Sequence, residues 1–248
     1  MLTPEEKQRY DRQIMIPGIG EIGQEKLKKA RVVIAGSGGL GSPISFYLTA
    51  AGVGTLRIID NDRVELSNLN RQILHWDKDI GKAKATSAHE KLTQLNKNVM
   101  IETIDTIIDE TNVSKLVAGF DVIVDAMDNM PTRYLLNKAA IEHRIPFVHG
   151  AVSGLEGRAM TIIPGKSACI RCLYHATPPK KKFPVLGTTP AIIGTIQATE
   201  VVKYLTGIGT LLTNRLLIYD GLNMKFTELS VVRNPNCEHC GDLVLGKE

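Results

Sequence analysis

The stretch Arg31-Val-Val-Ile-Ala-Gly-Ser-Gly-Gly-Leu-Gly-Ser42 decides the fold of this chain. Its first part, 31–35, is short, mostly apolar and rich in β-branched residues, which predicts a buried parallel strand. Apolar residues recur at helical spacing after the last glycine, so we expect a helix to begin there. A strand, a glycine turn and a helix N-terminus together form a phosphate cradle, because free N–H groups and the helix dipole attract anions. The glycines have the spacing G-x-G-x-x-G with one addition: Gly36, Gly38, Gly39 and Gly41.

A second apolar run, Thr55 to Ile59, predicts a neighbouring strand that ends in Asp60. Asp60 lies about 20 residues beyond the glycine turn, where nucleotide-binding folds of this kind place an acceptor for a ribose hydroxyl. A glycine-rich turn alone could be a packing feature. Because the strand, the helix and the acidic residue all have the expected spacing, we interpret the stretch as a nucleotide-binding site.

Size and composition indicate a globular protein. With 248 residues, 43% of them hydrophobic and 23% charged, the chain can bury a substantial core as one large domain or two small ones. The net charge of +4 is modest and the cations are scattered, so nothing indicates a nucleic-acid partner. The first residues are charged and no run of 18 uncharged apolar residues occurs. We therefore expect a cytoplasmic protein without a membrane span.

Two C-x-x-C pairs account for all 4 cysteines: Cys169 with Cys172, and Cys237 with Cys240. In an intracellular enzyme this pattern predicts a tetrahedral zinc site, because thiolates are soft ligands and each pair supplies two of them. Free or disulfide-linked thiols are the alternative. The 64 residues between the pairs, 173–236, mean that a metal would tie distant segments together. A closed four-thiolate shell leaves no coordination position for chemistry, so the zinc would be structural.

A polar stretch, 61–73, follows the second predicted strand at its carboxyl end, where ligands bind in open parallel sheets. A loop that only satisfies its own turns would have a similar composition. A helix predicted to start at Gly81 carries Lys82 and Lys84 in its first turn. A cation there opposes the helix dipole, and a phosphate would compensate it. Three side chains of the polar stretch could donate hydrogen bonds to a phosphate: Asn68, Arg71 and Gln72.

Two carboxylates follow a predicted strand over 121–125, on the edge of the sheet that carries the glycine turn. Asp125 ends the strand and Asp128 lies just beyond it. A carboxylate beside a phosphate is repulsive unless a cation lies between them, so Asp128 predicts a Mg²⁺ site. The alternative is that Asp128 caps the helix that starts near Pro131.

The expected fold class is α/β: a Rossmann-like, mostly parallel sheet flanked by helices, with C-terminal antiparallel strands and a four-cysteine zinc knuckle. The segment 9–14 is dense in arginine. It could be a solvated arm, or it could reach the site of a neighbouring subunit. We expect residues 1–248 to form a single unit with a helical arm over 1–29, a nucleotide-binding part over 31–151 and a β-rich part with a crossover loop over 152–248.

Taken in order, these motifs resemble the adenylyltransferases of the ubiquitin-activating superfamily, of the bacterial MoeB, ThiF and HesA type. The resemblance runs from about residue 5 to the C-terminus and includes both cysteine pairs. The other matching segments are Arg9-Tyr-Asp-Arg-Gln-Ile14, Gly36-Ser-Gly-Gly-Leu-Gly41, Ile59-Asp60, Ser67-Asn-Leu-Asn-Arg-Gln72, Gly81-Lys-Ala-Lys84, Asp125-Ala-Met-Asp-Asn129 and Gly194-Thr-Ile-Gln-Ala198.

Such enzymes use ATP to adenylate the C-terminal Gly-Gly carboxylate of a small ubiquitin-like sulfur carrier of the MoaD or ThiS type, and they release pyrophosphate. The resemblance implies that Gly39 meets the phosphates and Asp60 the ribose, and that Asp128 binds Mg²⁺ with Asn129 nearby. It further implies that Arg12 is an arginine finger, supplied by the other subunit of a homodimer. The triphosphate would be held by Asn68, Arg71 and Lys84, with Gln72 beside them.

The chemistry agrees with this assignment. Attack of a carboxylate on the α-phosphate brings one anion towards another, so positive charge and alignment must drive catalysis rather than a protein nucleophile. The expected catalytic residues are Arg12, Arg71, Lys84 and Asp128. Many relatives carry a cysteine in the long loop before the Gly194 helix, whereas 180–190 has none here. We therefore expect the reaction to stop at the acyl-adenylate, with sulfur transfer left to another protein such as a sulfurtransferase.

Other functions fit parts of the pattern. An activator of a carboxylate on modified tRNA would share the fold, but its relatives generally lack the cysteine pairs. A non-catalytic nucleotide-binding scaffold would be expected to lose the charged residues that are present here. An NAD-dependent dehydrogenase would need a nicotinamide pocket and a proton-transfer residue, and the sequence offers neither.

Overall fold

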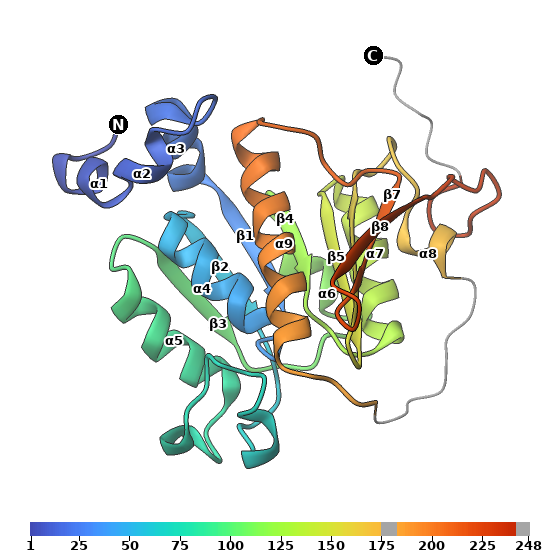
Figure 1. Ribbon diagram of the computed structural model, residues 1–248, viewed down its shortest axis with the longest axis horizontal. Coiled ribbons are helices and arrows are strands. Elements are labelled where there is room, and N and C mark those ends of the chain that lie inside the picture. Colours follow the sequence, from blue (N-terminus) through green and yellow to red (C-terminus); the bar gives the residue numbers. More distant parts are fainter. Residues whose placement is uncertain (175–182, 242–248) are drawn as a thin grey trace.

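One mixed sheet runs through the part of the chain that the computed structural model describes, residues 1–174 and 183–241 (Figure 1). Its strand order is β3-β2-β1-β4-β5-β6-β7-β8. Neighbouring strands from β3 to β5 are parallel and those from β5 to β8 are antiparallel, which confirms the predicted fold class. The strands are β1 (Arg31–Ala35), β2 (Thr55–Ile59), β3 (Met100–Ile104), β4 (Val122–Asp125), β5 (Phe147–Ser153), β6 (Glu156–Ile162), β7 (Arg215–Asp220) and β8 (Lys225–Ser230).

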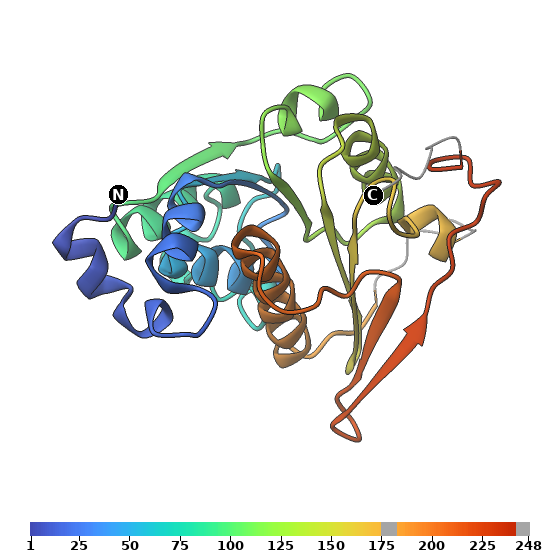
Figure 2. The same cartoon turned by 90° about the horizontal axis from the view of Figure 1, so that it is seen from above.

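Helices cover both faces of the parallel part of the sheet (Figure 2). In β1, Val32 and Ile34 pack into one apolar core, which α4, α5 and α9 cover. Val33 and Ala35 point to the other core, beneath α6 and α7. The helices are α1 (Pro4–Arg9), α2 (Asp11–Ile14), α3 (Gly20–Lys29), α4 (Gly41–Ala51), α5 (Lys84–Leu95), α6 (Val113–Val117), α7 (Met130–His143), α8 (Ile170–Leu173) and α9 (Thr188–Thr206), with 3-10 turns η1 (Leu66–Asn68) and η2 (Asp77–Asp79).

The double burial of β1 explains why its sequence is an almost continuous apolar run rather than an alternating one. It also explains why the glycine turn has a fixed position relative to the sheet. The turn follows a strand that is held on both faces by packed side chains, so its backbone is presented from a rigid part of the molecule. Two glycines with left-handed backbone, Gly52 (φ 80°) and Gly207 (φ 84°), end α4 and α9, as such caps commonly do.

The N-terminal helices lie at the end of the sheet where β1 begins, opposite the end that carries the glycine turn (Figure 1). Gln13 of α2 donates a hydrogen bond to the carbonyl of Ala51 at the end of α4 (2.8 Å), and Asn96 donates one to the hydroxyl of Tyr10 (2.8 Å). Because α4 has 11 residues, its end lies about 16 Å from the glycine turn at which it begins. The arm is therefore remote from that turn in the same chain.

Three element boundaries differ from the sequence-based expectations. The helix predicted from Gly81 begins at Lys84, because Gly81 has a left-handed backbone (φ 86°) and Ala83 has a non-helical one (φ −58°, ψ 132°). Lys82 therefore precedes the helix and pairs with Asp79 (3.3 Å) and Glu90 (2.7 Å). Residues 4–14, for which the sequence favours one polar helix, form two helices, α1 and α2, that meet at Tyr10.

The third difference concerns α9: the pair Thr189-Pro190 is typical of a helix cap followed by the first helical residue, but α9 already starts at Thr188. The long loop predicted before it includes residues 175–182, which lie outside the described residues. No helix in the described ranges is long and apolar enough to cross a lipid bilayer.

Candidate nucleotide site and cysteine cluster

The glycine turn depends on two glycines at which a side chain would not fit. A Cβ atom at Gly36, where φ is +99°, would lie 2.6 Å from the carbonyl oxygen of Ala126. A Cβ atom at Gly41 would lie 2.0 Å from the carbonyl oxygen of Gly36. The turn is therefore tightly closed and lies against the end of β4, where the chain continues to Asp128.

The structure brings Arg71 and Gln72 next to the glycines. A Cβ atom at Gly38 would lie 3.5 Å from Nε2 of Gln72, and one at Gly39 would lie 3.6 Å from Cγ of Arg71. The Arg71 guanidinium donates to the carbonyl of Ser67 at 2.8 Å. These side chains therefore line the space above the turn, as expected if they meet phosphate.

Asp60 is attached directly to the glycine turn. One carboxylate oxygen accepts hydrogen bonds from the backbone N–H (2.7 Å) and the hydroxyl (3.0 Å) of Ser37. The other accepts from the backbone N–H of Asp62 (2.9 Å). A carboxylate has lone pairs left after these contacts, so Asp60 can still accept from a ribose hydroxyl.

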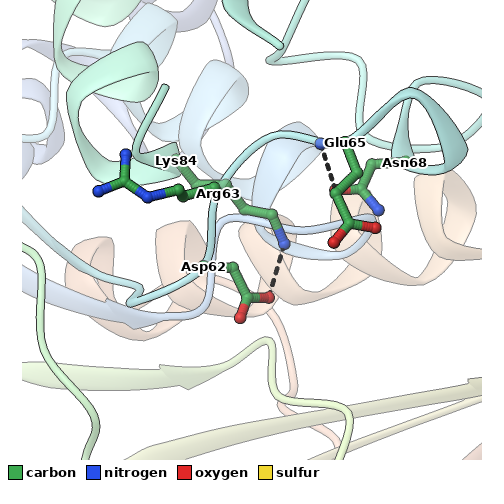
Figure 3. Close-up of a pocket in the computed structure, with 5 residues that line it drawn as sticks. All are labelled: Asp62, Arg63, Glu65, Asn68 and Lys84. Carbon is green, nitrogen blue, oxygen red and sulfur yellow. Dashed lines mark hydrogen bonds and ion pairs between the residues drawn. The ribbon is translucent and has the colours of Figure 1, made fainter. Parts of the chain in front are cut away.

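The side chain of Lys84 lines a small polar pocket (Figure 3). Its side chain is only 6% exposed, and its ammonium group forms an ion pair with the Asp62 carboxylate at 2.8 Å. Asn68 lies on the same pocket and is held by a hydrogen bond from the backbone N–H of Glu65 to its side-chain oxygen (3.2 Å). The pocket has a volume of about 130 Å³ and is lined by Asp62, Arg63, Glu65, Asn68 and Lys84.

Asp128 is exposed beyond the carboxyl end of β4. The interpretation that it caps the following helix is wrong, because the N-cap of α7 is Asn129, whose side-chain oxygen accepts from the backbone N–H of Thr132 (3.0 Å). Asn129 also donates to the Asp128 carboxylate at 3.4 Å. The Asp128 carboxylate is thus left accessible to a cation, and carboxylate oxygens suit Mg²⁺.

A buried charged cluster that we did not predict from the sequence holds the loop before Asp128. Asp125 is fully buried and pairs with Arg133 (3.1 Å) and with Nδ1 of His149 (2.7 Å). Burial would raise the pKa of Asp125, but Arg133 and His149 outweigh it and lower that pKa below its ordinary value. Burial lowers the pKa of His149, so its neutral ring donates from Nδ1–H.

The cluster also fixes the backbone of this loop. Arg133 donates to the carbonyls of Met127 and Gly150, and the carboxylate of Asp125 accepts from the N–H of Met127 (3.0 Å). Gln197 of α9 donates to the carbonyl of Asp125 (2.7 Å). Nothing in the local sequence indicates these contacts, because the participating residues come from four different elements.

His75 is a second buried group that the sequence-based interpretation missed. Its Nε2–H donates to the carbonyl of Ser37 in the glycine turn (3.0 Å), and its Nδ1 accepts from the hydroxyl of Ser87 (2.9 Å). Burial, with smaller contributions from Lys84 and Lys91, lowers the pKa of His75 to about 4. The neutral ring connects the glycine turn to α5, the helix that carries Lys84.

Arg12 is not brought to the site of its own chain. Its side chain is 92% exposed on α2, at the opposite edge of the sheet, and lies 4.0 Å from Asp11. The other residues predicted for the nucleotide site lie in the glycine turn, in the segments that follow β2 and β4, and at the start of α5.

The two cysteine pairs come together in the fold. The four Sγ atoms all lie within 4.8 Å of one another, and three of the separations are 3.9, 3.6 and 3.5 Å. Tetrahedral zinc with Zn–S bonds of about 2.3 Å would place the sulfurs about 3.8 Å apart. The cluster is therefore compatible with zinc.

A buried asparagine of α7 hydrogen-bonds to both cysteine pairs. Asn137 is fully buried; its oxygen accepts from the backbone N–H of Ile170, and its amide nitrogen lies 2.9 Å from Nδ1 of His239. Ile170 lies between the cysteines of one pair and His239 between those of the other. This bridge was not predicted, because an isolated asparagine in a helix carries no pattern that would reveal it.

Comparisons with known proteins agree with this geometry. A model of the ThiF family matches residues 10–239. The SAMP-activating enzyme E1 of Haloferax volcanii is 45% identical, over 94% of this chain and 88% of that protein. The sulfur carrier protein adenylyltransferase of Thermus thermophilus is 42% identical, over 97% of this chain and 93% of that protein. Among solved structures, E. coli MccB with ATP is 26% identical with a TM-score of 0.82, and the match covers 94% of this chain and 74% of that one.

Proposed function

The chain belongs to the ThiF family, and from that premise we propose that it is an adenylyltransferase that uses ATP to activate the C-terminal Gly-Gly carboxylate of a small ubiquitin-like sulfur carrier. Relatives that the chain covers almost completely are named as enzymes of this kind. The single observation that carries the proposal is the glycine turn itself, which packs against Arg71 at Gly39 and against Ala126 at Gly36 and which His75 links to α5, the helix that begins with Lys84. We take residues 1–248 to act as a single adenylation unit.

In the proposed reaction, a carboxylate oxygen of the carrier attacks the α-phosphorus of ATP. The new bond is a mixed anhydride, the bond from the α-phosphorus to the bridging oxygen breaks, and pyrophosphate leaves with its electron pair. The glycine turn and the N-terminus of α4 would seat the phosphates through backbone N–H groups. Asp60 would accept a ribose hydroxyl. No protein nucleophile is needed.

Charge compensation is the main contribution that the side chains would make. Lys84 and Arg71 would stabilise the negative charge that builds up on the departing pyrophosphate, with Asn68 and Gln72 as neutral donors beside them. The two cations are already held within the chain, because Lys84 is buried at the start of α5 and the Arg71 guanidinium donates a hydrogen bond to the carbonyl of Ser67. Asp128 would hold Mg²⁺, which when bound neutralises phosphate charge.

Arg12 requires a second copy of the chain. Because it lies at the far edge of the sheet, we propose that it acts as a finger in the site of the partner within a homodimer. Its exposure and its position on a short helix outside the sheet support this role. The same helix is anchored to α4 through Gln13, so its direction is defined before the partner binds.

We also propose that the cysteine cluster binds a structural zinc ion. Four buried thiols at separations close to those of a tetrahedral site leave no vertex for substrate. The chain has 4 cysteines, all of them in this cluster. A thioester or persulfide on this chain therefore has no free thiol available, and sulfur transfer falls to a separate protein such as a sulfurtransferase.

The test is ATP–pyrophosphate exchange with and without a Gly-Gly-ended carrier. We expect carrier-dependent exchange that Arg71→Ala or Asp128→Ala lowers by at least about 10²- to 10³-fold. Lys138→Ala, which removes a surface cation on α7, is the matched control and should exchange normally. Exchange that requires tRNA, or that is absent with every carrier tried, would reject the proposal.

The trans role of Arg12 can be examined by mixing two inactive variants. Subunits with Arg12→Ala and subunits with Asp128→Ala each lack one part of the site. A mixed dimer would contain one complete site if Arg12 serves its partner, so activity should return on mixing. Activity that stays absent in a mixed dimer, verified by mass spectrometry, would argue against the finger.

A further inference from the structure

We propose that Asp62 is an internal stand-in for phosphate. In this role its carboxylate forms an ion pair with the ammonium group of Lys84 before nucleotide binds. The triphosphate then replaces Asp62 as the partner of Lys84, and the Asp62–Lys84 pair forms again when pyrophosphate leaves. The inference rests on the proposed function, because it requires Lys84 to meet the phosphates of ATP. Asp62 is then a positioning residue that sets how tightly the site holds both ATP and its product.

The two partners of this ion pair differ strongly in exposure. The Lys84 side chain is 6% exposed and the Asp62 side chain is 63% exposed, with 2.8 Å between nitrogen and oxygen. A buried ammonium group without a compensating anion is costly, whereas an exposed carboxylate can turn into water at little cost. The lysine therefore stays in place when partners change, and Asp62 is the side that can move.

Figure 3 shows where the exchange would occur. The Lys84 ammonium group points to Asp62 across the pocket, with Asn68 and Glu65 on its other side. An anion that enters this pocket meets the Lys84 cation and the Asp62 carboxylate together. It is attracted by one and repelled by the other, so the carboxylate must turn away for the anion to bind well.

The backbone of Asp62 is held while its side chain is exposed. Its N–H donates to the carboxylate of Asp60 (2.9 Å), and its carbonyl accepts from the backbone N–H of Lys84 (2.9 Å). The residue therefore lies between the proposed ribose acceptor and the first residue of α5. Because the main chain of Asp62 is held by hydrogen bonds to both Asp60 and Lys84, its carboxylate is kept within reach of the Lys84 ammonium group. The ion pair is therefore more than an incidental surface contact.

The expected size of the effect follows from the exposure of the carboxylate. Ion pairs with one solvent-exposed partner are modest, so the loss of Asp62 should change affinity by about three- to ten-fold. The effect should fall on ligands that contain the β- and γ-phosphates. AMP lacks them and leaves the Asp62–Lys84 pair intact, so its affinity should stay within about two-fold.

The experiment measures equilibrium binding of ATP, AMP and pyrophosphate by calorimetry, in magnesium-free buffer without chelator so that the cysteine cluster is undisturbed. We expect Asp62→Asn to bind ATP and pyrophosphate about three- to ten-fold more tightly than the wild type, with AMP unchanged. In product-inhibition assays, pyrophosphate should inhibit the variant at a correspondingly lower concentration. Weaker ATP binding, or an equal change for AMP, would overturn the proposal.

Two further variants make the result specific. Lys84→Met should abolish the gain from Asp62→Asn in the double variant, because no cation remains to be released. A gain that persists there would also overturn the proposal. Asp77→Asn removes the same charge from the same segment between β2 and α5, and should bind ATP as the wild type does. Asp62→Ser should reproduce the effect with a smaller side chain.

Failure of this inference is distinguishable from failure of the proposed function. Binding is measured without any carrier, so the Asp62 result is obtained whether or not exchange occurs. If Asp62→Asn shows no change while carrier-dependent exchange is intact, the stand-in role is rejected and adenylation stands. If the variant binds ATP more tightly but no carrier supports exchange, adenylation is rejected and the ion-pair exchange at Lys84 stands.

Discussion

The candidate nucleotide site, which we call the nucleotide edge (the glycine turn, the segments that follow β2 and β4, and the start of α5), differs from the cysteine cluster in how its charges are compensated. At the nucleotide edge, charged groups already have partners within the chain: Lys84 with Asp62, and Asp125 with Arg133 and His149. In the cysteine cluster, four thiols gather within 4.8 Å. Burial raises the pKa of Cys240 to about 11 and also raises that of Cys169, so these two thiols resist becoming thiolates. Burial would also raise the pKa of Cys237, but hydrogen bonds from the backbone of His239 and Cys240 outweigh it and lower that pKa.

This difference shows which site the fold can complete alone. The buried charges of the nucleotide edge are neutralised within the chain, Lys84 by Asp62 and Asp125 by Arg133 and His149, so this edge can form before any ligand arrives. The exposed Asp128 carboxylate is left accessible to a cation. The cysteine cluster takes its four thiols from both sides of a long chain segment. We expect formation of the cluster to be linked to binding of the proposed zinc ion, and removal of that ion to lower stability more than activity.

The largest expected effect comes from removing the metal. Structural zinc contributes on the order of 10 kcal/mol to small metallo-domains, so we expect metal-free protein, or Cys172→Ser, to melt more than about 10 °C lower. Metal analysis should find one zinc per chain, and zinc should restore the melting temperature of chelated wild type. An unchanged melting temperature would remove the contrast between the two regions.

A smaller effect is expected from unbalancing the nucleotide edge. Arg133→Met leaves the fully buried Asp125 without its guanidinium partner and should cost about 3–5 kcal/mol in urea unfolding. The double variant Asp125→Asn with Arg133→Met should recover part of this loss, because the buried charge is gone. If the single variant is as stable as the wild type, the nucleotide edge does not depend on its internal pairs.

The smallest effect concerns pH and His75. The unfolded chain binds a proton at this histidine near pH 6.5, whereas the folded chain does so only near pH 4. Between these values the unfolded state holds more protons, so stability falls as pH falls, by about 1.4 kcal/mol per unit and about 3 kcal/mol in total. His75→Gln cannot titrate, and unfolding measured from pH 4 to 7 should show a slope smaller by that amount. An unchanged slope would show that His75 is not buried neutral beside the glycine turn.

Much of the fold could be predicted because its signals are local. The strands at 31–35 and 55–59 have the predicted bounds, since an apolar run between turn residues is specific at short range. The helix expected from Gly81 was wrong at its start, because a glycine with left-handed backbone interrupts the chain three residues before α5. Such backbone geometry is set by the neighbouring bridge between Arg63 and Ala83 and is not visible in composition.

The candidate site divides in the same way. The glycines, Asp60, Asn68, Arg71 and Lys84 could be named because motif spacing places them at the ends of neighbouring strands. Asp128 was correctly placed, but its neighbour Asn129, rather than Asp128 itself, caps α7. The roles proposed for all of them, and for Arg12, remain predictions until the exchange and mixing experiments are done.

By itself, the sequence determined the strand–turn–helix cradle, the charged residues that follow its strands and the two C-x-x-C pairs, because each of these depends on residues close together in the chain. Only the tertiary structure decided that Arg133, His149 and Gln197 fix the loop before Asp128 through Asp125. It also decided that His75 hydrogen-bonds to the glycine turn and that Asp62 forms an ion pair with Lys84. These contacts join segments far apart in sequence. Burial and distance, which set their strength, do not exist until the chain has folded.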